Sequence, residues 1–448
     1  MTYNIHDSKV HIFSNREVVL LSKIVFVPLS YLMKRQILYI AFLFVVSSLF
    51  AEPFYTHVTV NNIRTLQVRI ADNPLAIPVI ELGSDQSVRI SFDEMSYEPK
   101  SYTYALVHCN ADWTRSSLSE VDYLEGFANG SIDNYAFSSN TTTLYVHYQF
   151  DVPNADLKLK VSGNYAVVIA QDNDFTKPVA VACFSVVESR VTVKGSVRGN
   201  TDRELAGRYQ QVDFEVQTSG YEVRDPFTEL KVTVQQNRRW DNAVTNLTPT
   251  YTSSNVQSYT NNRRLIFEGG NQYRSIDFSS EYTYGSGIDR ITFDRTFYHV
   301  WLFPSETRAG RGVEQGYDAN GQFLVNRQRS NDVDVEADYM WVHFAVPMSE
   351  PYFNGTLCLL GQLFSNQIDE QSRMVYDFAQ KAYVKSLFLK QGGYNFQYLF
   401  VEKDAKSGTL QPVEGSYWQT ENEYAIYVYH RPWGERYDKL VAVKLVSQ

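Results

Sequence analysis

The chain has 448 residues, of which 44% are hydrophobic and 20% are charged, and its net charge is −9 at pH 7. This composition can fill several hydrophobic cores, and the acidic balance excludes nucleic acid as a partner because phosphate contacts need a basic surface. The aromatic content of 15% is high. Aromatic residues favour strands, although the same residues also suit a glycan-binding face.

Near the N-terminus, residues 33–51 have the layout of a secretory signal peptide. Lys34 and Arg35 precede an apolar run that ends in small residues, which is the expected order of regions. The run is shorter than the roughly twenty apolar residues of a membrane-spanning helix, so we expect cleavage before Glu52 and a function outside the cytoplasm. A signal peptide normally opens a chain, so we interpret 1–32 as a mis-called extension. The alternative is that apolar residues upstream extend the run into an anchor.

The expected mature chain, 52–448, is predicted to be soluble and without a lipid tether. No cysteine stands at or just after the cleavage position, where a lipoprotein carries its lipid. The first 51 residues hold five basic and two acidic side chains. The net charge is therefore −12 for 52–448, compared with −9 for the whole chain. No later segment approaches about eighteen consecutive apolar residues, so no further spanning helix is expected.

Period-two alternation dominates the mature chain and predicts an all-β protein. Short strands separated by turn signals favour β-sandwiches, and the lack of βαβ alternation argues against a parallel α/β enzyme fold. We predict three consecutive immunoglobulin-like or early-set sandwiches, over 52–189, 190–335 and 336–448. The one helix candidate is 118–127, with Ser119 as its cap. Strands are expected at 65–70, 88–92, 103–109, 144–150, 165–170, 179–187, 191–197, 212–218, 230–236, 264–268, 290–293, 297–303, 339–346, 357–360, 383–389, 394–401, 424–429 and 440–446.

The three cysteines lie in separate apolar, strand-like runs, and we interpret them as buried free thiols. They are Cys109, Cys183 and Cys358. A bridge between Cys109 and Cys183 stays open as an alternative in an oxidising compartment, because sequence spacing cannot decide it. Three cysteines without a CxxC motif do not build a zinc site by themselves.

No sequence motif of nucleophilic, metal or phosphate chemistry is found: HExxH, GxSxG and the P-loop are all missing from the sequence. Four histidines fall in the middle of predicted strands, and we interpret them as packed, hydrogen-bonded residues. They are His108, His147, His299 and His343. We therefore expect no catalytic residue, no resident metal and no cofactor.

An acidic stretch near the predicted boundary at 335 has carboxylates at every second position. These are Asp332, Asp334, Glu336 and Asp338, and in a strand all four would lie on one face. We interpret them as a solvated acidic edge that prevents edge-to-edge pairing. A Ca²⁺ site is the alternative, because that cation takes oxygen ligands.

Two clusters rich in Arg and Trp are the candidate partner interface. They consist of Arg238, Arg239, Trp240 and Asp241 after one predicted strand, and of Arg431, Trp433, Arg436 and Tyr437 near the C-terminus. Arg and Trp are enriched at interaction hot spots. The alternative is that the tryptophans close a core while the arginines pair with carboxylates.

Several spaced stretches together carry a family resemblance. They are PVIELGSDQSVRISFDE (78–94), VHCNADW (107–113), YLEGFANGSIDNYAFSSNT (123–141), QNRRWDNAVTNLTP (236–249), FEGGNQYRSIDF (267–278), ADYMWVHF (337–344), LKQGGYNFQYLFV (389–401), EGSYWQTENEY (414–424) and YHRPWGERYDKLVAV (429–443). In this order they resemble the plug protein family of the type IX secretion system of Bacteroidota. The resemblance covers nearly all of 52–448, and 1–32 fall outside it.

The resemblance implies a non-enzymatic periplasmic protein, peripheral to the outer membrane and not inserted into it. It would dock on the periplasmic mouth of a giant outer-membrane β-barrel, the type IX translocon, and close the barrel when no cargo passes. Neither a small-molecule substrate nor a cofactor is implied, and the third domain would be similar to early-set, glycogen-binding-type sandwiches. Two alternatives stay open. One is a glycan-binding sandwich protein with Tyr417, Trp418 or Trp433 as stacking platforms, and the other is a hydrolase with a carboxylate pair, which needs no local motif.

Overall fold

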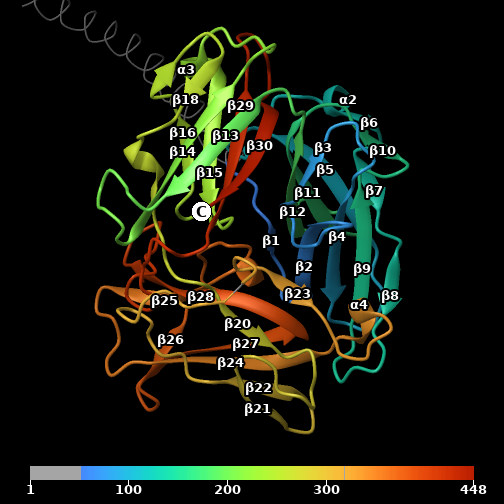
Figure 1. Ribbon diagram of the computed structural model, residues 1–448. Helices are drawn as coiled ribbons and strands as arrows, with labels where there is room; N and C mark the ends of the chain where they lie inside the picture. The colour runs from blue at the N-terminus through green and yellow to red at the C-terminus, as the bar shows by residue number, and fades with distance from the viewer. Residues whose placement is uncertain (1–51, 317) are drawn as a thin grey trace, which may run out of the picture. The chain divides into compact units, whose positions relative to one another are not determined.

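The computed structural model describes residues 52–316 and 318–448 (Figure 1). The predicted signal peptide at 33–51 and the predicted extension at 1–32 lie outside the described residues. The chain divides into two units, 1–53 and 54–448, and every described strand belongs to the second. This second unit is built almost wholly from antiparallel sheets, which confirms the predicted all-β fold with several sandwiches.

The first sandwich is formed by sheets whose strands all lie within 57–187. Buried aliphatic and aromatic side chains from both main sheets form one core, in which the ring of Phe92 packs 5.2 Å from those of Tyr102 and Tyr148. The sheet orders are β1-β12-β11-β5-β7, with β3 beside β12, then β2-β4-β9-β8, and β10-β6. The strands are β1 (His57–Val58), β2 (Ile63–Ile70), β3 (Val79–Glu81), β4 (Val88–Glu94), β5 (Tyr102–Cys109), β6 (Leu124–Gly126), β7 (Asn129–Ser131), β8 (Tyr135–Phe137), β9 (Val146–Val152), β10 (Leu157–Leu159), β11 (Gly163–Gln171) and β12 (Pro178–Val187).

Strand β12 is apolar on both of its faces, because each face meets a separate cluster. Phe184 and Val186 point into the sandwich core, whereas Cys183 packs with Cys109 and Trp113 on the other side of the sheet. All three cysteines are buried and free, as the sequence predicts. The alternative bridge between Cys109 and Cys183 is not formed.

The predicted helix at 118–127 is a single turn, α2 (Glu120–Tyr123). Ser119 caps it as expected, and its backbone N–H donates to the Asp122 carboxylate over 2.9 Å. The helix ends early because Leu124 adopts an extended backbone and pairs with Leu159 across the β6–β10 ladder.

The second sandwich combines residues from the middle and from the end of the chain, around a core that runs from Val191 to Val446. Its sheets have the orders β13-β14-β18-β17, with β19 beside β14, and β16-β15-β29-β30. Its elements are β13 (Thr192–Arg198), β14 (Tyr209–Gln217), α3 (Pro226–Glu229), β15 (Leu230–Gln236), β16 (Val244–Leu247), β17 (Tyr251–Thr252), β18 (Val256–Ser258), the 3₁₀ turn η1 (Arg263–Leu265), β19 (Ile266–Glu268), β29 (Glu423–His430) and β30 (Lys439–Ser447).

The third sandwich lies between these two parts in the sequence, and its core runs from Ile276 to Val413. Its sheets have the orders β20-β28-β23, with β25 beside β28, and β21-β22-β24-β27-β26. Its elements are β20 (Arg274–Asp277), β21 (Ile288–Phe293), β22 (Tyr298–Leu302), β23 (Phe323–Val325), α4 (Val333–Glu336), β24 (Tyr339–Pro347), β25 (Gly355–Leu360), the 3₁₀ turn η2 (Gln362–Phe364), β26 (Val375–Asp377), β27 (Ala382–Lys390) and β28 (Gly392–Glu402).

The predicted division at 335 into consecutive second and third domains does not match the strand pairing. Strand β29 pairs with β15, where Val232 lies opposite Val428, and β20 pairs with β28. One sandwich is therefore inserted into the sequence of the other. The period-two pattern identifies strands but not their partners, since pairing depends on side chains that are distant in the sequence.

The acidic stretch at 332–338 does not form the strand that its alternation predicts. Asp332 caps α4, and its side chain accepts a hydrogen bond from the backbone of Asp334 over 3.1 Å. Over four residues, an Asp cap followed by acidic residues in the first turn favours a helix equally well. Among the described residues, no group of three or more His, Cys, Asp and Glu side chains is placed to hold a metal ion.

Candidate functional site

The first predicted interface cluster begins with a buried ion pair. Arg239 and Asp241 are each 2% exposed, and two parallel hydrogen bonds of 3.0 and 2.8 Å join them. Burial alone would lower the pKa of Arg239, but the charge of Asp241 outweighs it and the pKa is raised. Asp241 also accepts the backbone N–H of Gly408 over 3.1 Å. This pair therefore holds two segments of the chain together.

Arg238 and Trp240 face the first sandwich. The Arg238 guanidinium donates to the carbonyl of Leu75 and to the side-chain oxygen of Gln322, each over 2.7 Å. Trp240 packs edge-on against Trp113, with ring centroids 5.9 Å apart. Arg238 thus connects the turn after β15 to the first sandwich and to the third, and Trp240 connects the same turn to the first sandwich.

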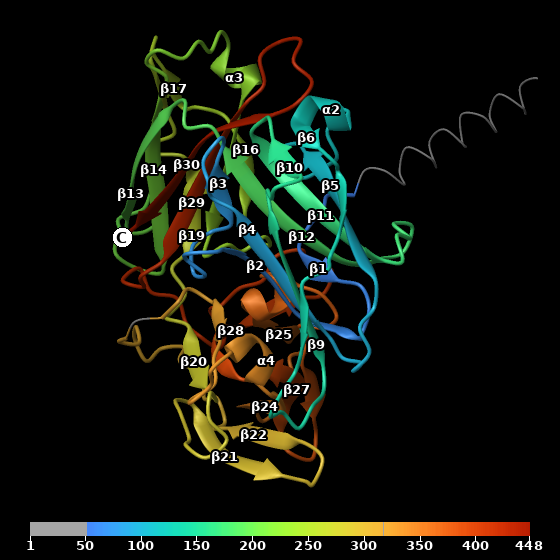
Figure 2. The ribbon, with the colours of Figure 1, turned by 90° about the vertical axis from the view of Figure 1, so that its right-hand side faces the viewer.

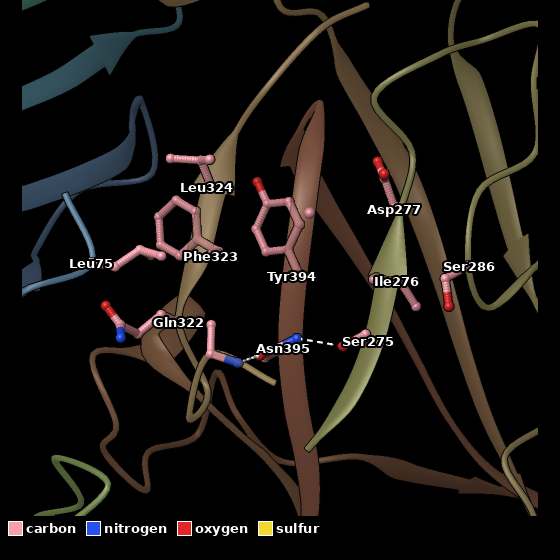
Figure 3. Close-up of a pocket in the computed structure, with 12 residues that line it drawn as sticks. Leu75, Ser275, Ile276, Asp277, Ser286, Gln322, Phe323, Leu324, Tyr394 and Asn395 are labelled. Carbon is pink, nitrogen blue, oxygen red and sulfur yellow. Dashed lines mark hydrogen bonds between the residues drawn. The ribbon is translucent and has the colours of Figure 1, made fainter. Parts of the chain in front are cut away.

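A cavity of about 250 Å³ lies beside Arg238, since Leu75 and Gln322 are among its lining residues. Figure 3 shows Tyr394 on β28 and Phe323 on β23 facing the cavity; their rings are stacked 5.0 Å apart. Its polar groups are largely committed: Asn395, for example, donates to Ser275 over 2.6 Å. Among the described residues, the lining is mainly apolar and contains no titratable pair suited to catalysis.

The second predicted cluster is in the β29–β30 connection, residues 431–438, which we call the 431–438 loop. Arg431 pairs with Asp438 over 2.8 Å, and the fully buried Asp438 also accepts the backbone N–H of Ala111 over 2.9 Å. Arg431 donates further to Asn110 over 2.5 Å. The start and the end of the loop are therefore bound to the first sandwich.

The middle of the 431–438 loop makes similar contacts. Arg436 pairs with Asp122 of α2 over 2.8 Å, and the ring of Tyr437 meets that of His108 edge-on at 5.4 Å. Burial raises the pKa of Tyr437 to about 12 and lowers that of His108 to about 4. Both rings are therefore neutral at pH 7.

Trp433 differs from the other predicted interface residues, because its side chain is 92% exposed. The loop that carries it is joined to α3 by the hydrogen bond from the Arg431 N–H to the Glu229 carbonyl, 2.8 Å long. Two further exposed apolar residues lie on the adjoining turns: Phe227 of α3 is 54% exposed and Val121 of α2 is 74% exposed. Figure 2 shows α3, the 431–438 loop and α2 along one end of the sheets. We call Trp433, Phe227, Val121 and Arg436 the Trp433 surface.

A buried polar network between the first and third sandwiches was not foreseen from the sequence. Lys390 and Asp93 are each 1% exposed and 2.7 Å apart. Asp93 also accepts hydrogen bonds from Tyr339 and His147, both over 2.6 Å. The ammonium of Lys390 lies 4.3 Å from the ring centre of Tyr145. The aromatic and alternating pattern around these residues gave no signal that two distant strands would share one buried charge pair.

A chain of hydrogen bonds on the outer face of the β22-β24-β27 strands was also not foreseen. Asp294, His299, His343 and Ser386 are linked in that order by contacts of 3.1, 2.9 and 2.8 Å. His343 stacks on Trp301 with 4.0 Å between ring centres. Burial and the neighbouring His299 lower the pKa of His343 to about 4. Each imidazole uses both nitrogens within this chain, which leaves neither histidine free to ligate a metal.

Comparison with known proteins gives a consistent result. The family model of the type 9 secretion system plug protein 1st domain matches residues 63–188. The solved structure of a hypothetical protein from Parabacteroides merdae is similar over 89% of this chain and 100% of its own length, with 42% sequence identity and a TM-score of 0.87. The chain belongs to the type IX secretion system plug protein family. Among curated proteins, none matches it.

A second solved structure matches too weakly to inform either the fold or the function of this protein. The alkylpurine DNA glycosylase of Pseudomonas fluorescens, solved with DNA containing an abasic site analog, covers 28% of this chain and 30% of its own at 13% identity, with a TM-score of 0.15. The plug family model, by contrast, spans the first sandwich from the start of β2 to the end of β12.

Two of the three candidate glycan platforms are engaged within the chain. The hydroxyl of Tyr417 donates to the carbonyl of Arg308 over 3.0 Å. Trp418 lies so close to Gly199 that a Cβ there would clash with the indole ring.

None of the described helices is long and apolar enough to span a bilayer.

Proposed function

We propose that this protein is a non-enzymatic plug, which docks on the periplasmic mouth of the outer-membrane type IX translocon barrel and closes it when no cargo is exported. The observation that carries this proposal is the match of 63–188 to the plug family. The protein would act in the periplasm, at the inner face of the outer membrane, by fitting its surface to the barrel rather than by chemistry.

The size of the chain is adequate for this role. The largest single-chain barrels have about 36 strands, and with strands about 4.8 Å apart and tilted about 40° the inner diameter is roughly 60 Å. A compact chain of roughly 400 residues has a diameter of about 55 Å. A single sandwich of roughly 110 residues, about 35 Å across, would leave such a mouth largely open.

We infer that the Trp433 surface contacts the barrel. The other residues of the two Arg- and Trp-rich clusters are mostly committed to contacts within the chain, whereas Trp433 and Phe227 are 92% and 54% exposed. Exposed aromatic side chains that a soluble protein holds in place are typical of interaction sites. Arg436 adds a charge that is 56% exposed beside Asp122.

The first experiment is an affinity pull-down of the tagged protein from gently solubilised outer membranes, with mass spectrometry of the co-purifying chains. We expect a very large barrel protein at near-equal stoichiometry. Recovery of the tagged chain alone would contradict the plug proposal.

The role of the Trp433 surface is tested with Trp433→Ala combined with Phe227→Ala. Loss of a hot-spot aromatic costs about 2 kcal/mol or more in binding, equivalent to roughly thirtyfold, so co-purification of the barrel should largely disappear. Phe353→Ala is the matched control, because Phe353 is fully exposed but lies in the third sandwich. If the control loses the barrel to the same extent, the assignment of this surface is wrong.

A further inference from the structure

A groove of about 190 Å³ lies where β1 and β2 meet the segment after β25. One wall is residues 55–66 of the first sandwich, and the other is residues 362–371, which contain η2. Phe388 of β27 and Tyr394 of β28 line it from the third sandwich. The groove is separate from the Trp433 surface and none of the predicted interface residues lines it.

Aromatic rings supply part of the apolar lining, beside aliphatic side chains such as Val60, Leu66 and Leu363. Phe323 stacks on Tyr394 with 5.0 Å between ring centres and an angle of 7°, and Tyr55 stacks on His57 at 4.2 Å. The ring of Phe388, which lines the groove, lies 5.1 Å from that of Trp341, so Trp341 continues the aromatic surface beyond the groove. Tyr394 is covered on both faces, because Phe278 stacks on it as well, at 5.3 Å, whereas Tyr55 is 42% exposed. An exposed flat ring such as that of Tyr55 is suited to contact with the C–H face of a ligand ring.

Neutral amides and hydroxyls supply most of the polar part. Asn61, Gln367 and Gln371 line the groove, and among the described residues their side chains have no hydrogen-bond partner. Each carries an acceptor oxygen and two donor hydrogens. These side chains are therefore available to a ligand that offers both donors and acceptors.

The charges along the groove nearly cancel. Arg64 and Asp369 are the permanently charged side chains in the described lining, one of each sign. Phosphate-bearing and carboxylate-bearing ligands are held by clusters of cations, so the balance here favours a neutral ligand. An extended peptide is held mainly by main-chain hydrogen bonds to a free strand edge. Strands β1 and β2 are the end strands of their sheets, but β1 has only two residues and the pairing of β2 with β4 shifts register between Arg64 and Gln67, so the groove presents only a short and irregular edge to a peptide.

We propose that this groove binds a neutral carbohydrate, with a sugar ring against the aromatic lining and its hydroxyls bonded to Asn61, Gln367 and Gln371. Sugars combine an apolar C–H face with a rim of hydroxyls that both donate and accept, which matches the two kinds of lining. The volume is below the roughly 300 Å³ at which pockets for drug-sized ligands begin. It therefore suits one ring, with the rest of an oligosaccharide extending along Phe388 toward Trp341.

The test uses the whole mature chain, 52–448, and a panel of neutral oligosaccharides: trimers of β-1,4-linked N-acetylglucosamine, of β-1,4-linked glucose and of α-1,4-linked glucose. Binding is measured by titration calorimetry and by saturation-transfer NMR, with Trp fluorescence as a reporter near Trp341. We expect one trimer to bind with a dissociation constant in the millimolar range or tighter. No binding to any of the three at millimolar concentration would overturn the proposal.

The site is located with the double variant Asn61→Ala, Gln371→Ala. Loss of two hydrogen bonds should weaken binding by about tenfold or more. Gln328→Ala is the matched control, because Gln328 is an exposed neutral amide outside the groove lining and should keep the parent affinity. If the double variant binds as tightly as the parent chain, or if a neutral polar peptide binds more tightly than every sugar, the assignment is wrong.

The carbohydrate proposal and the plug proposal fail separately. The Asn61→Ala, Gln371→Ala variant should still co-purify the outer-membrane barrel, since its substitutions lie away from the Trp433 surface. A chain that binds sugar but recovers no barrel would refute the plug function alone. A chain that recovers the barrel but binds no sugar would refute the groove alone.

Discussion

Substitution of Lys390 by Met is the sharpest test of how the first and third sandwiches are held together. The ammonium is 1% exposed and 2.7 Å from Asp93, and it also donates to the carbonyl of Asp334 over 2.6 Å. Met keeps most of the apolar stem but removes the charge. Asp93 is then left as a buried carboxylate whose hydrogen bonds come from Tyr339 and His147.

The expected cost is large because one partner of a buried pair is removed. Breaking such a pair typically costs about 3–5 kcal/mol, most of which reflects the unpaired charge that stays behind. Replacing Asp93 by Asn as well removes that charge, so Lys390→Met with Asp93→Asn should be more stable than Lys390→Met alone by about 2 kcal/mol. The two substitutions are therefore expected to be strongly non-additive.

Urea unfolding followed by Trp fluorescence measures the free energies of unfolding of the parent chain, both single variants and the double variant. A loss below about 1 kcal/mol for Lys390→Met would refute the argument, since it would mean that Asp93 is not left unpaired in a dry environment. A double variant less stable than both single variants would refute it equally.

The pH dependence gives an independent check on the same network. Burial alone would raise the pKa of Asp93, but the charge of Lys390 and the hydrogen bond from His147 outweigh burial, so the pKa is lowered. A carboxylate with a lowered folded-state pKa stabilises the protein above its unfolded pKa, near 4, and this stabilisation is lost as the pH falls further. The slope of stability against pH below about 4 should therefore be smaller in Asp93→Asn than in the parent chain.

Three further predictions concern single groups. Burial raises the pKa of Cys109 to about 12, and all three thiols are buried, so a thiol reagent at pH 8 should modify none in the native protein and all three after unfolding. Burial lowers the pKa of His108 to about 4, so between about pH 6.5 and 4 the unfolded chain binds a proton that the folded chain does not. About 3 kcal/mol of stability should therefore be lost as the pH falls over this interval. His108→Phe should lose less stability over the same interval. Gly126 has a φ of +101° and a Cβ there would clash with the Asp156 carbonyl, so Gly126→Ala should lower the free energy of unfolding by about 2 kcal/mol or more, and an unchanged urea midpoint would contradict this reading.

The sequence determined the strands of this protein to a large extent. The apolar runs at 165–170 and 179–187 predict what the structure contains as β11 and β12, because a short apolar run bounded by turn signals is typical of a strand that is buried on both faces. The single-turn helix was also anticipated through Ser119, since a side chain that caps the first turn acts locally. The family could be recognised for a similar reason, because the order of short stretches is a property of the chain alone.

Tertiary structure decided which strands pair and which polar residues are buried. The hairpin at 423–447 joins the sheet of 230–236, across the predicted boundary at 335, because ladder partners are chosen by packing between distant segments. Asp241 lies two positions from Arg239, yet only the fold shows that both are 2% exposed. Lys390 and Asp93 are nearly three hundred positions apart, and no local pattern could place one opposite the other. Burial and partner choice depend on the whole chain, whereas strand propensity depends on the neighbours of a residue.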